Sequence, residues 1–142
     1  MAGFAPEDFP AHAVDKLRYG DTDRQGHVNN AVFTTFLETG RCEFLLDPAD
    51  PVLEPDTSFV IARLELDYRA EVHWPGTVDI YSRVASVGRS SVKVEQAVYQ
   101  GTTLVATAVT VIVLVHASTR RSHPLSEKAT ARFRGLMGRA GD

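Results

Sequence analysis

The apolar residues change their spacing along the chain, and each spacing predicts an element. Val14 to Tyr19 is a short strand candidate that ends at Gly20, where a polar run begins. In the next segment, apolar residues recur at spacings of three, four and seven or eight, which predicts one buried face of a helix over Asn30 to Leu46. This stripe consists of Val32, Phe33, Phe36, Leu37, Phe44 and Leu45. Asn29 or Asn30 is expected to cap the helix.

Gly40 lies inside this predicted helix and costs about 1 kcal/mol of helix stability relative to alanine. A close approach by another backbone is one reason to retain a glycine there. We therefore expect the helix to lie tight against a sheet.

Beyond a connection rich in Pro and Asp, the period changes to two residues, which is typical of strands. The predicted strands are Ser58 to Arg69, Thr77 to Val87, Ser90 to Tyr99 and Thr102 to His116, separated by turns rich in Gly and Pro. The last strand is apolar on both faces, which indicates cover on both sides, and a partner subunit could supply one cover. Ser126 can cap a short final helix that ends near Met137.

The order of elements predicts the fold class: one strand, a helix, four antiparallel strands and a terminal helix form an α+β layer with a sheet wrapped round one helix. No GxGxxG or GxxxxGK[ST] run is present, which argues against a dinucleotide-binding or P-loop fold. The 142 residues, 44% hydrophobic and 23% charged, fit one domain over 1–142. Residues 1–12 are expected to form a loose arm, and they lack the pattern of a signal peptide.

Composition excludes several classes of function. A net charge of -3 and a pI of about 5.9 argue against a nucleic-acid partner, because phosphate binding needs a basic face. The longest apolar stretch, Leu104 to Val115, is too short for a membrane helix of about 20 residues, so no membrane partner is expected. Cys42 is the single cysteine, and a cytoplasmic location follows from the lack of disulfides. The histidines have no metal-binding spacing, so no metal site is expected.

Two segments carry the candidate chemistry. The first is Arg18-Tyr19-Gly20-Asp21-Thr22-Asp23-Arg24-Gln25-Gly26-His27-Val28-Asn29-Asn30, followed by Phe36-Leu37-Glu38 and Arg41. The second is Gly88-Arg89-Ser90-Ser91 between two strands. Together they resemble the active-site region of the 4-hydroxybenzoyl-CoA thioesterase family of hot-dog enzymes. The element order fits that family from about Val14 to Ala117.

The resemblance implies an architecture and an activity. It implies a hot-dog fold, with a five-stranded antiparallel sheet wrapped around one long central helix and a short C-terminal helix added. It implies a homodimer with active sites at the interface, and a homotetramer as a higher assembly. The implied activity is hydrolysis of an acyl-CoA, or of an acyl carrier protein thioester, to free acid and thiol. No cofactor is implied, because coenzyme A is part of the substrate.

The same resemblance assigns roles to residues of the first segment. The second Asp of the Asp-x-Asp run, Asp23, is implied as nucleophile or general base, with Asp21 in support. Substrate-binding positions are Tyr19, Gly26, Asn29, Arg89, Ser90 and Ser91, the last three facing the pantetheine or phosphates of CoA.

Elementary chemistry supports this assignment. Attack on a thioester carbonyl leaves negative charge on its oxygen, which the free N–H groups of a helix N-terminus stabilise. The backbone N–H of Asn30 is suitably positioned in the sequence. A tight turn at Gly26 could bring the carboxylate of Asp23 to the same carbonyl.

Two other residues are alternatives for catalysis. His27 could transfer protons, but a role in orienting the loop or contacting substrate is favoured, because no Ser or Cys nucleophile is paired with it. Glu38 lies about two helical turns beyond Asn30, where other hot-dog thioesterases carry their carboxylate, or it could pair with Arg41 or Arg18 as a structural charge.

A different class of function also fits the sequence. A non-catalytic hot-dog module would bind an acyl-CoA or assemble with a partner through a similar pocket, whereas a hot-dog dehydratase typically has a different His and carboxylate pattern. The identity of the acyl group depends on pocket depth, which this pattern does not determine.

Overall fold

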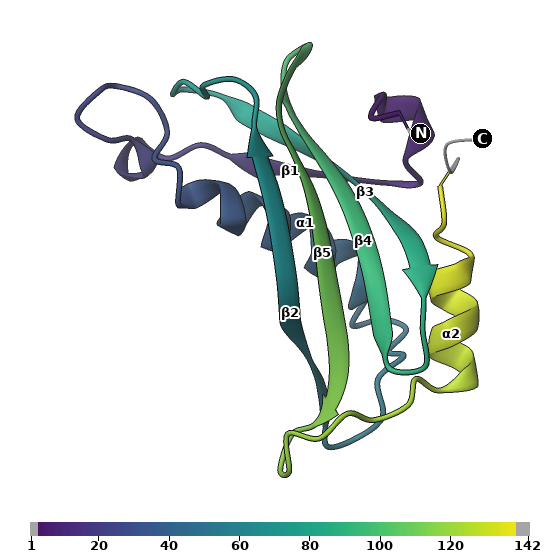
Figure 1. Cartoon of the computed structure of the whole chain (residues 1–142). Helices are drawn as coiled ribbons and strands as arrows, with labels where there is room; N and C mark the ends of the chain where they lie inside the picture. Colours follow the sequence, from purple (N-terminus) through teal and green to yellow (C-terminus); the bar gives the residue numbers. More distant parts are fainter. Residues whose placement is uncertain (1–2, 139–142) are drawn as a thin grey trace.

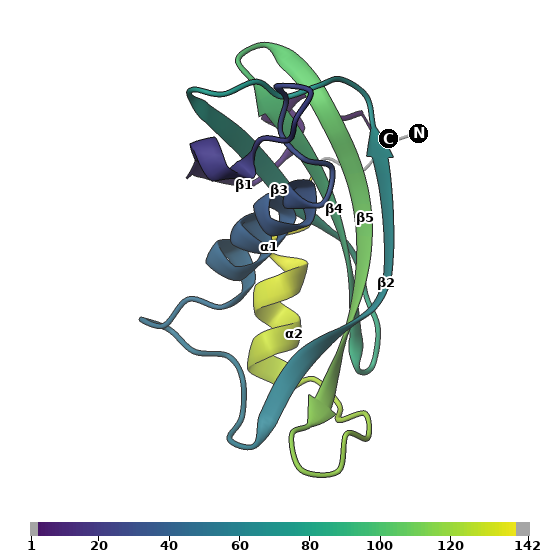
Figure 2. The ribbon, with the colours of Figure 1, turned by 90° about the vertical axis from the view of Figure 1, so that its left-hand side faces the viewer.

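The computed structural model describes residues 3–138, and these form one antiparallel sheet with two α-helices (Figure 1). The elements are β1 (Ala11–Lys16), α1 (Val32–Leu45), β2 (Thr57–Tyr68), β3 (Thr77–Val87), β4 (Ser91–Gln100), β5 (Thr103–His116) and α2 (Glu127–Arg134). The strand order is β1-β3-β4-β5-β2. Both helices lie on the concave face of the curved sheet (Figure 2).

This architecture confirms the predicted α+β layer with a five-stranded antiparallel sheet and a short C-terminal helix. The four strands after the helix begin and end within one or two residues of the predicted bounds. Helix α1 has 14 residues, an ordinary length rather than a long one, and it begins at Val32. No helix within residues 3–138 combines the length and apolar character needed to cross a bilayer.

The first strand differs from its prediction, because β1 covers Ala11–Lys16 rather than Val14 to Tyr19. The chain leaves the sheet at Arg18, where the Asp21 carboxylate accepts a hydrogen bond from the Arg18 N–H at 2.9 Å and closes a 3-10 turn over Tyr19–Asp21. This local capping bond competes with continuation of the strand.

The N-terminal segment is packed rather than loose. Phe9 is buried and lies over Tyr81 and the guanidinium of Arg83, whose Cζ is 4.3 Å from the Phe9 ring centroid. The hydroxyl of Tyr99 donates a hydrogen bond to the carbonyl of Phe4 at 2.6 Å. The structure therefore corrects the prediction of a loose arm over 1–12 from Gly3 onward, because Phe4 and Phe9 are held against the sheet. Residues 1 and 2 lie outside the described range.

Helix α1 is fixed to the sheet around Gly40. The Nε2 of Gln96, a fully buried residue of β4, donates to the Leu37 carbonyl at 3.0 Å. A Cβ on Gly40 would lie 2.5 Å from Cγ2 of Ile80 and 2.8 Å from Nε2 of Gln96. The helix does lie tight against the sheet, but the close approach is made by side chains of β3 and β4, not by the neighbouring backbone that was expected.

This contact predicts the effect of Gly40→Ala. Overpacking against Ile80 costs about 1–3 kcal/mol, which exceeds the gain of about 1 kcal/mol in helix propensity. The difference leaves a net loss of up to about 2 kcal/mol, so we expect urea denaturation to give a lower free energy of unfolding than that of the wild type. Thr35→Ala, on the exposed face of the same helix, is the control and should change stability by less than about 0.5 kcal/mol. Equal stability of Gly40→Ala and wild type would contradict the packing argument.

Candidate active site

The loop between β1 and α1 is a tight turn held by main-chain hydrogen bonds. Thr22 and Val28 form an antiparallel bridge. The Asp23 N–H donates to the His27 carbonyl at 3.0 Å, and the Gly26 N–H donates to the Asp23 carbonyl at 3.1 Å. Gly26 has a φ of 87°, a left-handed conformation that glycine adopts without steric cost. The structure therefore has the tight turn at Gly26 that the sequence predicted.

Within this turn, Asp23 and His27 form a carboxylate–imidazole pair. Oδ2 of Asp23 lies 3.6 Å from Nδ1 of His27, with the two side chains 29% and 18% exposed. Oδ1 of Asp23 accepts the Gln25 N–H at 2.9 Å, and Nε2 of His27 lies 3.0 Å from Oε1 of Gln25. A carboxylate beside one ring nitrogen orients an imidazole.

The amide end of α1 follows directly. Oδ1 of Asn29 accepts the Ala31 N–H at 2.9 Å, and the Asn29 carbonyl accepts the Val32 N–H at 2.9 Å. The N-cap position is Ala31 rather than Asn29 or Asn30, although the Asn29 side chain does supply an acceptor to the first turn. Within residues 3–138, the Asn30 N–H has no hydrogen-bond acceptor. It is therefore free to bind a ligand oxygen.

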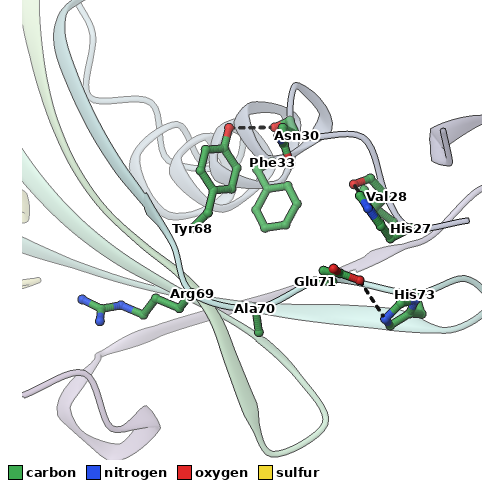
Figure 3. Close-up of a pocket in the computed structure, with 9 residues that line it drawn as sticks. All are labelled: His27, Val28, Asn30, Phe33, Tyr68, Arg69, Ala70, Glu71 and His73. Atoms are coloured by element: carbon green, nitrogen blue, oxygen red, sulfur yellow. Dashed lines mark hydrogen bonds and ion pairs between the residues drawn. The ribbon is translucent and has the colours of Figure 1, made fainter. Parts of the chain in front are cut away.

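The loop, the amide end of α1 and the end of β2 enclose a cavity of about 570 Å³ (Figure 3). This volume lies in the range of small-molecule sites, about 300–1,000 Å³. The lining residues are His27, Val28, Asn30, Phe33, Tyr68, Arg69, Ala70, Glu71 and His73. Two of the four predicted catalytic residues thus line one cavity, and Asp23 contacts one of them, His27.

Tyr68 connects the end of β2 to the helix terminus. Its hydroxyl donates to the Asn30 carbonyl at 3.0 Å, and its ring stands edge-on to Phe33 with centroids 5.1 Å apart. These contacts fix the main chain of Asn30 at the cavity wall.

Glu38 lies elsewhere. It lines two smaller cavities, of about 140 and 200 Å³, between α1 and β2, and it shares both with Arg41 and Ile61. No ion pair within 4.0 Å involves Glu38 in the described part of the chain. The structure therefore separates Glu38 from the cavity that contains His27 and Asn30.

The predicted substrate-binding residues are also divided. Tyr19 is exposed and packs edge-on against Trp74, at a centroid distance of 5.3 Å, outside the cavity. Arg89 and Ser90 form the turn between β3 and β4, at the opposite end of the sheet from the Asp23 loop (Figure 1). Ser91 closes that turn by accepting the Gly88 N–H at 2.8 Å. Within one chain, this turn does not meet the cavity.

Sequence reasoning missed three lining residues: Tyr68, Glu71 and His73. The sequence predicted Tyr68 only as part of the strand from Ser58 to Arg69. It indicated no role for His73, because the histidines have no metal-binding spacing. The available signal was local: Glu71 and His73 flank an apolar Val72, which places both on one side of an extended chain. Which cavity that side faces is a tertiary property.

Cys42 is poorly suited to act as a nucleophile. Burial raises the pKa of its thiol above the ordinary value, and the negative charge of Glu38 raises it further, although Arg41 acts in the opposite direction. The reactive form is the thiolate, which a raised pKa disfavours at neutral pH. Within residues 3–138, no group of three or more His, Cys, Asp and Glu side chains is arranged to hold a metal ion.

The sheet, its central helix and this cavity define the hot-dog thioesterase class. The sequence profile of the thioesterase-like superfamily matches residues 17–133, and the chain belongs to that superfamily. It is a thioester hydrolase. No curated protein sequence matches the chain.

Solved structures of other proteins share the fold. A thioesterase from Thermus thermophilus, complexed with coenzyme A and Zn, is 34% identical with a TM-score of 0.80 over 94% of this chain and 98% of that chain. The PA5185 protein of Pseudomonas aeruginosa strain PAO1 is 25% identical, with a TM-score of 0.83 over 95% and 96%. A DHNA-CoA thioesterase from Staphylococcus aureus shares the fold, with 15% identity and a TM-score of 0.79 over 89% and 91%.

The raised pKa of Cys42 predicts a pH dependence of its alkylation. Its rate with iodoacetamide should rise with pH to a midpoint above that of a free cysteine, because thiolate forms only above the raised pKa. Glu38→Gln removes a charge that raises this pKa, so the midpoint should move to lower pH. Glu43→Gln removes a charge on the same helix that does not contribute to the raised pKa of Cys42, so the midpoint should stay at the wild-type value. Identical midpoints for all three proteins would refute this account.

Proposed function

We propose that the chain hydrolyses acyl-CoA thioesters, or acyl carrier protein thioesters, in the cavity of about 570 Å³. The observation that supports this proposal is that His27, which Asp23 contacts, and Asn30, whose N–H has no acceptor within residues 3–138, line the same cavity. The relative from Thermus thermophilus, whose structure contains coenzyme A, supports the CoA ester as substrate. The reaction uses protein groups and water, and coenzyme A enters as part of the substrate.

Two routes are open to Asp23. As a general base, it removes a proton from a water molecule that attacks the thioester carbon. As a nucleophile, it attacks that carbon itself and forms an anhydride, which water then hydrolyses. In both routes the carbonyl oxygen becomes negative, the C–S bond breaks, and the thiolate that leaves takes up a proton.

The Asn30 amide and His27 support either route. The Asn30 N–H donates to the developing oxyanion, and the dipole of α1 adds to this stabilisation. Since His27 lines the cavity while Asp23 contacts its Nδ1, the imidazole orients the carboxylate and transmits a proton between it and the cavity. Glu38 would act only if a partner subunit brought it to this site.

We further propose a homodimer formed along β2. This 12-residue strand stands at one edge of the sheet, paired on one side with β5, and its Ile61 is 52% exposed. Long edge strands with exposed apolar residues are templates for pairing with another chain. A two-fold axis through β2 would pair it with its own copy and join the two sheets, and such dimers can assemble further into a tetramer.

This dimer would also account for the distant turn at Arg89. In an antiparallel pair of β2 strands, the far end of one sheet lies beside the cavity end of the other. Arg89, Ser90 and Ser91 of one protomer would then approach the cavity of its partner, where a guanidinium and small hydroxyls suit the phosphates and pantetheine of CoA. The active site would lie at the interface.

The role of Asp23 is tested by Asp23→Asn, which keeps the shape and removes the charge. We expect thiol release from acyl-CoA to fall at least about a hundredfold, because neither base nor nucleophile remains. Asp47→Asn, an exposed position after α1, is the matched control and should retain wild-type turnover. Wild-type rates in Asp23→Asn would remove Asp23 from the mechanism. In a single turnover in ¹⁸O-water, label in the Asp23 carboxylate would establish the nucleophile route with attack of water on the Asp23 carbonyl carbon, because the general-base route places all of the label in the released acid.

The dimer proposal is tested by Ile61→Asp. A charge buried at a β2–β2 interface would be desolvated without a partner, so light scattering should detect a shift from dimer or tetramer toward monomer. Thr102→Asp adds the same charge at the exposed hairpin between β4 and β5 and should leave the assembly unchanged. A monomeric wild-type protein, or an Ile61→Asp variant that assembles normally, would reject this interface.

A further inference from the structure

The segment after β2 forms a rigid wall of the cavity. Val72 is fully buried, and its carbonyl accepts the Val28 N–H at 2.8 Å, which ties this segment to the Asp23 loop. The His73 N–H donates to Oε1 of Gln100 at 3.1 Å, and Nε2 of Gln100 donates back to the His73 carbonyl at 2.7 Å. The main chain on both sides of Val72 is therefore fixed.

Glu71 and His73 project from this wall toward the cavity. Residues two apart on an extended chain point to the same side, and Figure 3 shows Glu71 and His73 side by side across the cavity from Asn30 and Phe33. Oε2 of Glu71 lies 3.6 Å from Nε2 of His73, and the His73 ring lies 6.5 Å from that of His27.

The Glu71 carboxylate has no cationic side chain of lysine or arginine beside it. Arg69 also lines the cavity, but its Nε donates to Oγ1 of Thr107 at 3.1 Å, and its guanidinium extends away from Glu71 (Figure 3). Within residues 3–138, the one ion-pair contact of Glu71 within 4.0 Å is the imidazole of His73. One wall of the cavity therefore presents a carboxylate that a bound molecule would meet.

A carboxylate in this position discriminates between ligands by charge. The Glu71 side chain is 61% exposed in the free protein, so water screens its charge until a bound acyl group displaces that water. A carboxylate on that acyl group would then be repelled by Glu71. A neutral acyl group meets no such repulsion, and a hydroxyl group can donate a hydrogen bond to Glu71. Neither Asp23 nor the Asn30 N–H makes this distinction, because both act on the thioester group that all substrates share.

We propose that Glu71 is a specificity-determining residue that rejects acyl groups ending in a carboxylate and admits neutral and hydroxylated ones. His73 holds the Glu71 carboxylate in place and takes no part in the reaction. This inference rests on the proposed thioester hydrolysis in the same cavity. It adds the substrate class: monoacyl-CoA esters rather than CoA esters of dicarboxylic acids.

The test compares kcat/KM for butyryl-CoA, 3-hydroxybutyryl-CoA and succinyl-CoA, whose acyl chains have the same carbon count. The wild-type enzyme should favour butyryl-CoA over succinyl-CoA by at least about tenfold. In Glu71→Gln, which keeps size and hydrogen bonding but removes charge, succinyl-CoA turnover should rise and this ratio should fall about tenfold. Butyryl-CoA turnover should change by less than about threefold.

Glu127→Gln is the control. Glu127 is exposed at the start of α2 and lies outside the cavity, so its neutralisation should leave the ratio at the wild-type value. An unchanged ratio in Glu71→Gln would overturn the proposal. An equal fall for all three substrates would also overturn it, because Glu71 would then act in folding or in the reaction itself.

Failure of the proposed function gives a different result. If the wild-type protein releases no thiol from any acyl-CoA, the hydrolysis proposal fails, and the charge preference is read from calorimetric dissociation constants of butyryl-CoA and succinyl-CoA thioether analogues. Tighter binding of the butyryl analogue that disappears in Glu71→Gln would still support the role of Glu71. Equal binding of both analogues by the wild type would reject it.

Discussion

The hydrogen bond between the Val28 N–H and the Val72 carbonyl, 2.8 Å long, joins the two walls of the cavity. Both residues are buried, at 1% and 0% exposure, so neither main-chain group has water as an alternative partner. An unpaired buried amide or carbonyl costs about 1–3 kcal/mol, which opposes separation of the walls. The reactive loop with Asp23 and His27 is on one side of this bond, and Glu71 and His73 are on the other.

The cavity divides its chemistry between these walls. The loop and the end of α1 present a carboxylate–imidazole pair and a free amide, which in the proposed reaction act on the thioester carbonyl. The segment after β2 presents Glu71, which in the proposed specificity acts on the rest of the acyl group. Tyr68 bridges the two walls through its bond to the Asn30 carbonyl, so the amide and the strand keep their relative positions. Under these two proposals, reactivity and selectivity would depend on different walls.

The two edges of the sheet differ in how much the chain itself covers them. On the side of β1, the Leu136 carbonyl accepts the N–H of Val84 in β3 at 3.0 Å, so the C-terminal segment covers the part of β3 that extends beyond β1. The edge formed by β2 has no such cover within residues 3–138. A self-complementary partner along β2 would protect this edge and bring the Arg89 turn to the neighbouring cavity. One constraint, an unpaired edge, would then account for both assembly and coenzyme binding.

The amino-acid sequence alone predicted most of the elements, because their signals are local: a two-residue period for β2 to β5, the stripe from Val32 to Leu45 for α1, and turn residues between the strands. It also determined the turn at Gly26, since a left-handed residue and its neighbouring hydrogen bonds lie within one short segment. Local patterns did not predict the docking of Phe4 and Phe9, because isolated aromatics outside a periodic run carry no information about the surface that they cover.

The packing of the elements in three dimensions determines which polar residues share a cavity. It joined His27 and Asn30 to Tyr68, Glu71 and His73, and it separated them from Glu38 and from the Arg89 turn. The physical reason is that a site forms between elements distant in the chain. Hydrophobic period determines which side of each element is buried, whereas strand order, sheet curvature and the Val28–Val72 bond determine which exposed sides face one another.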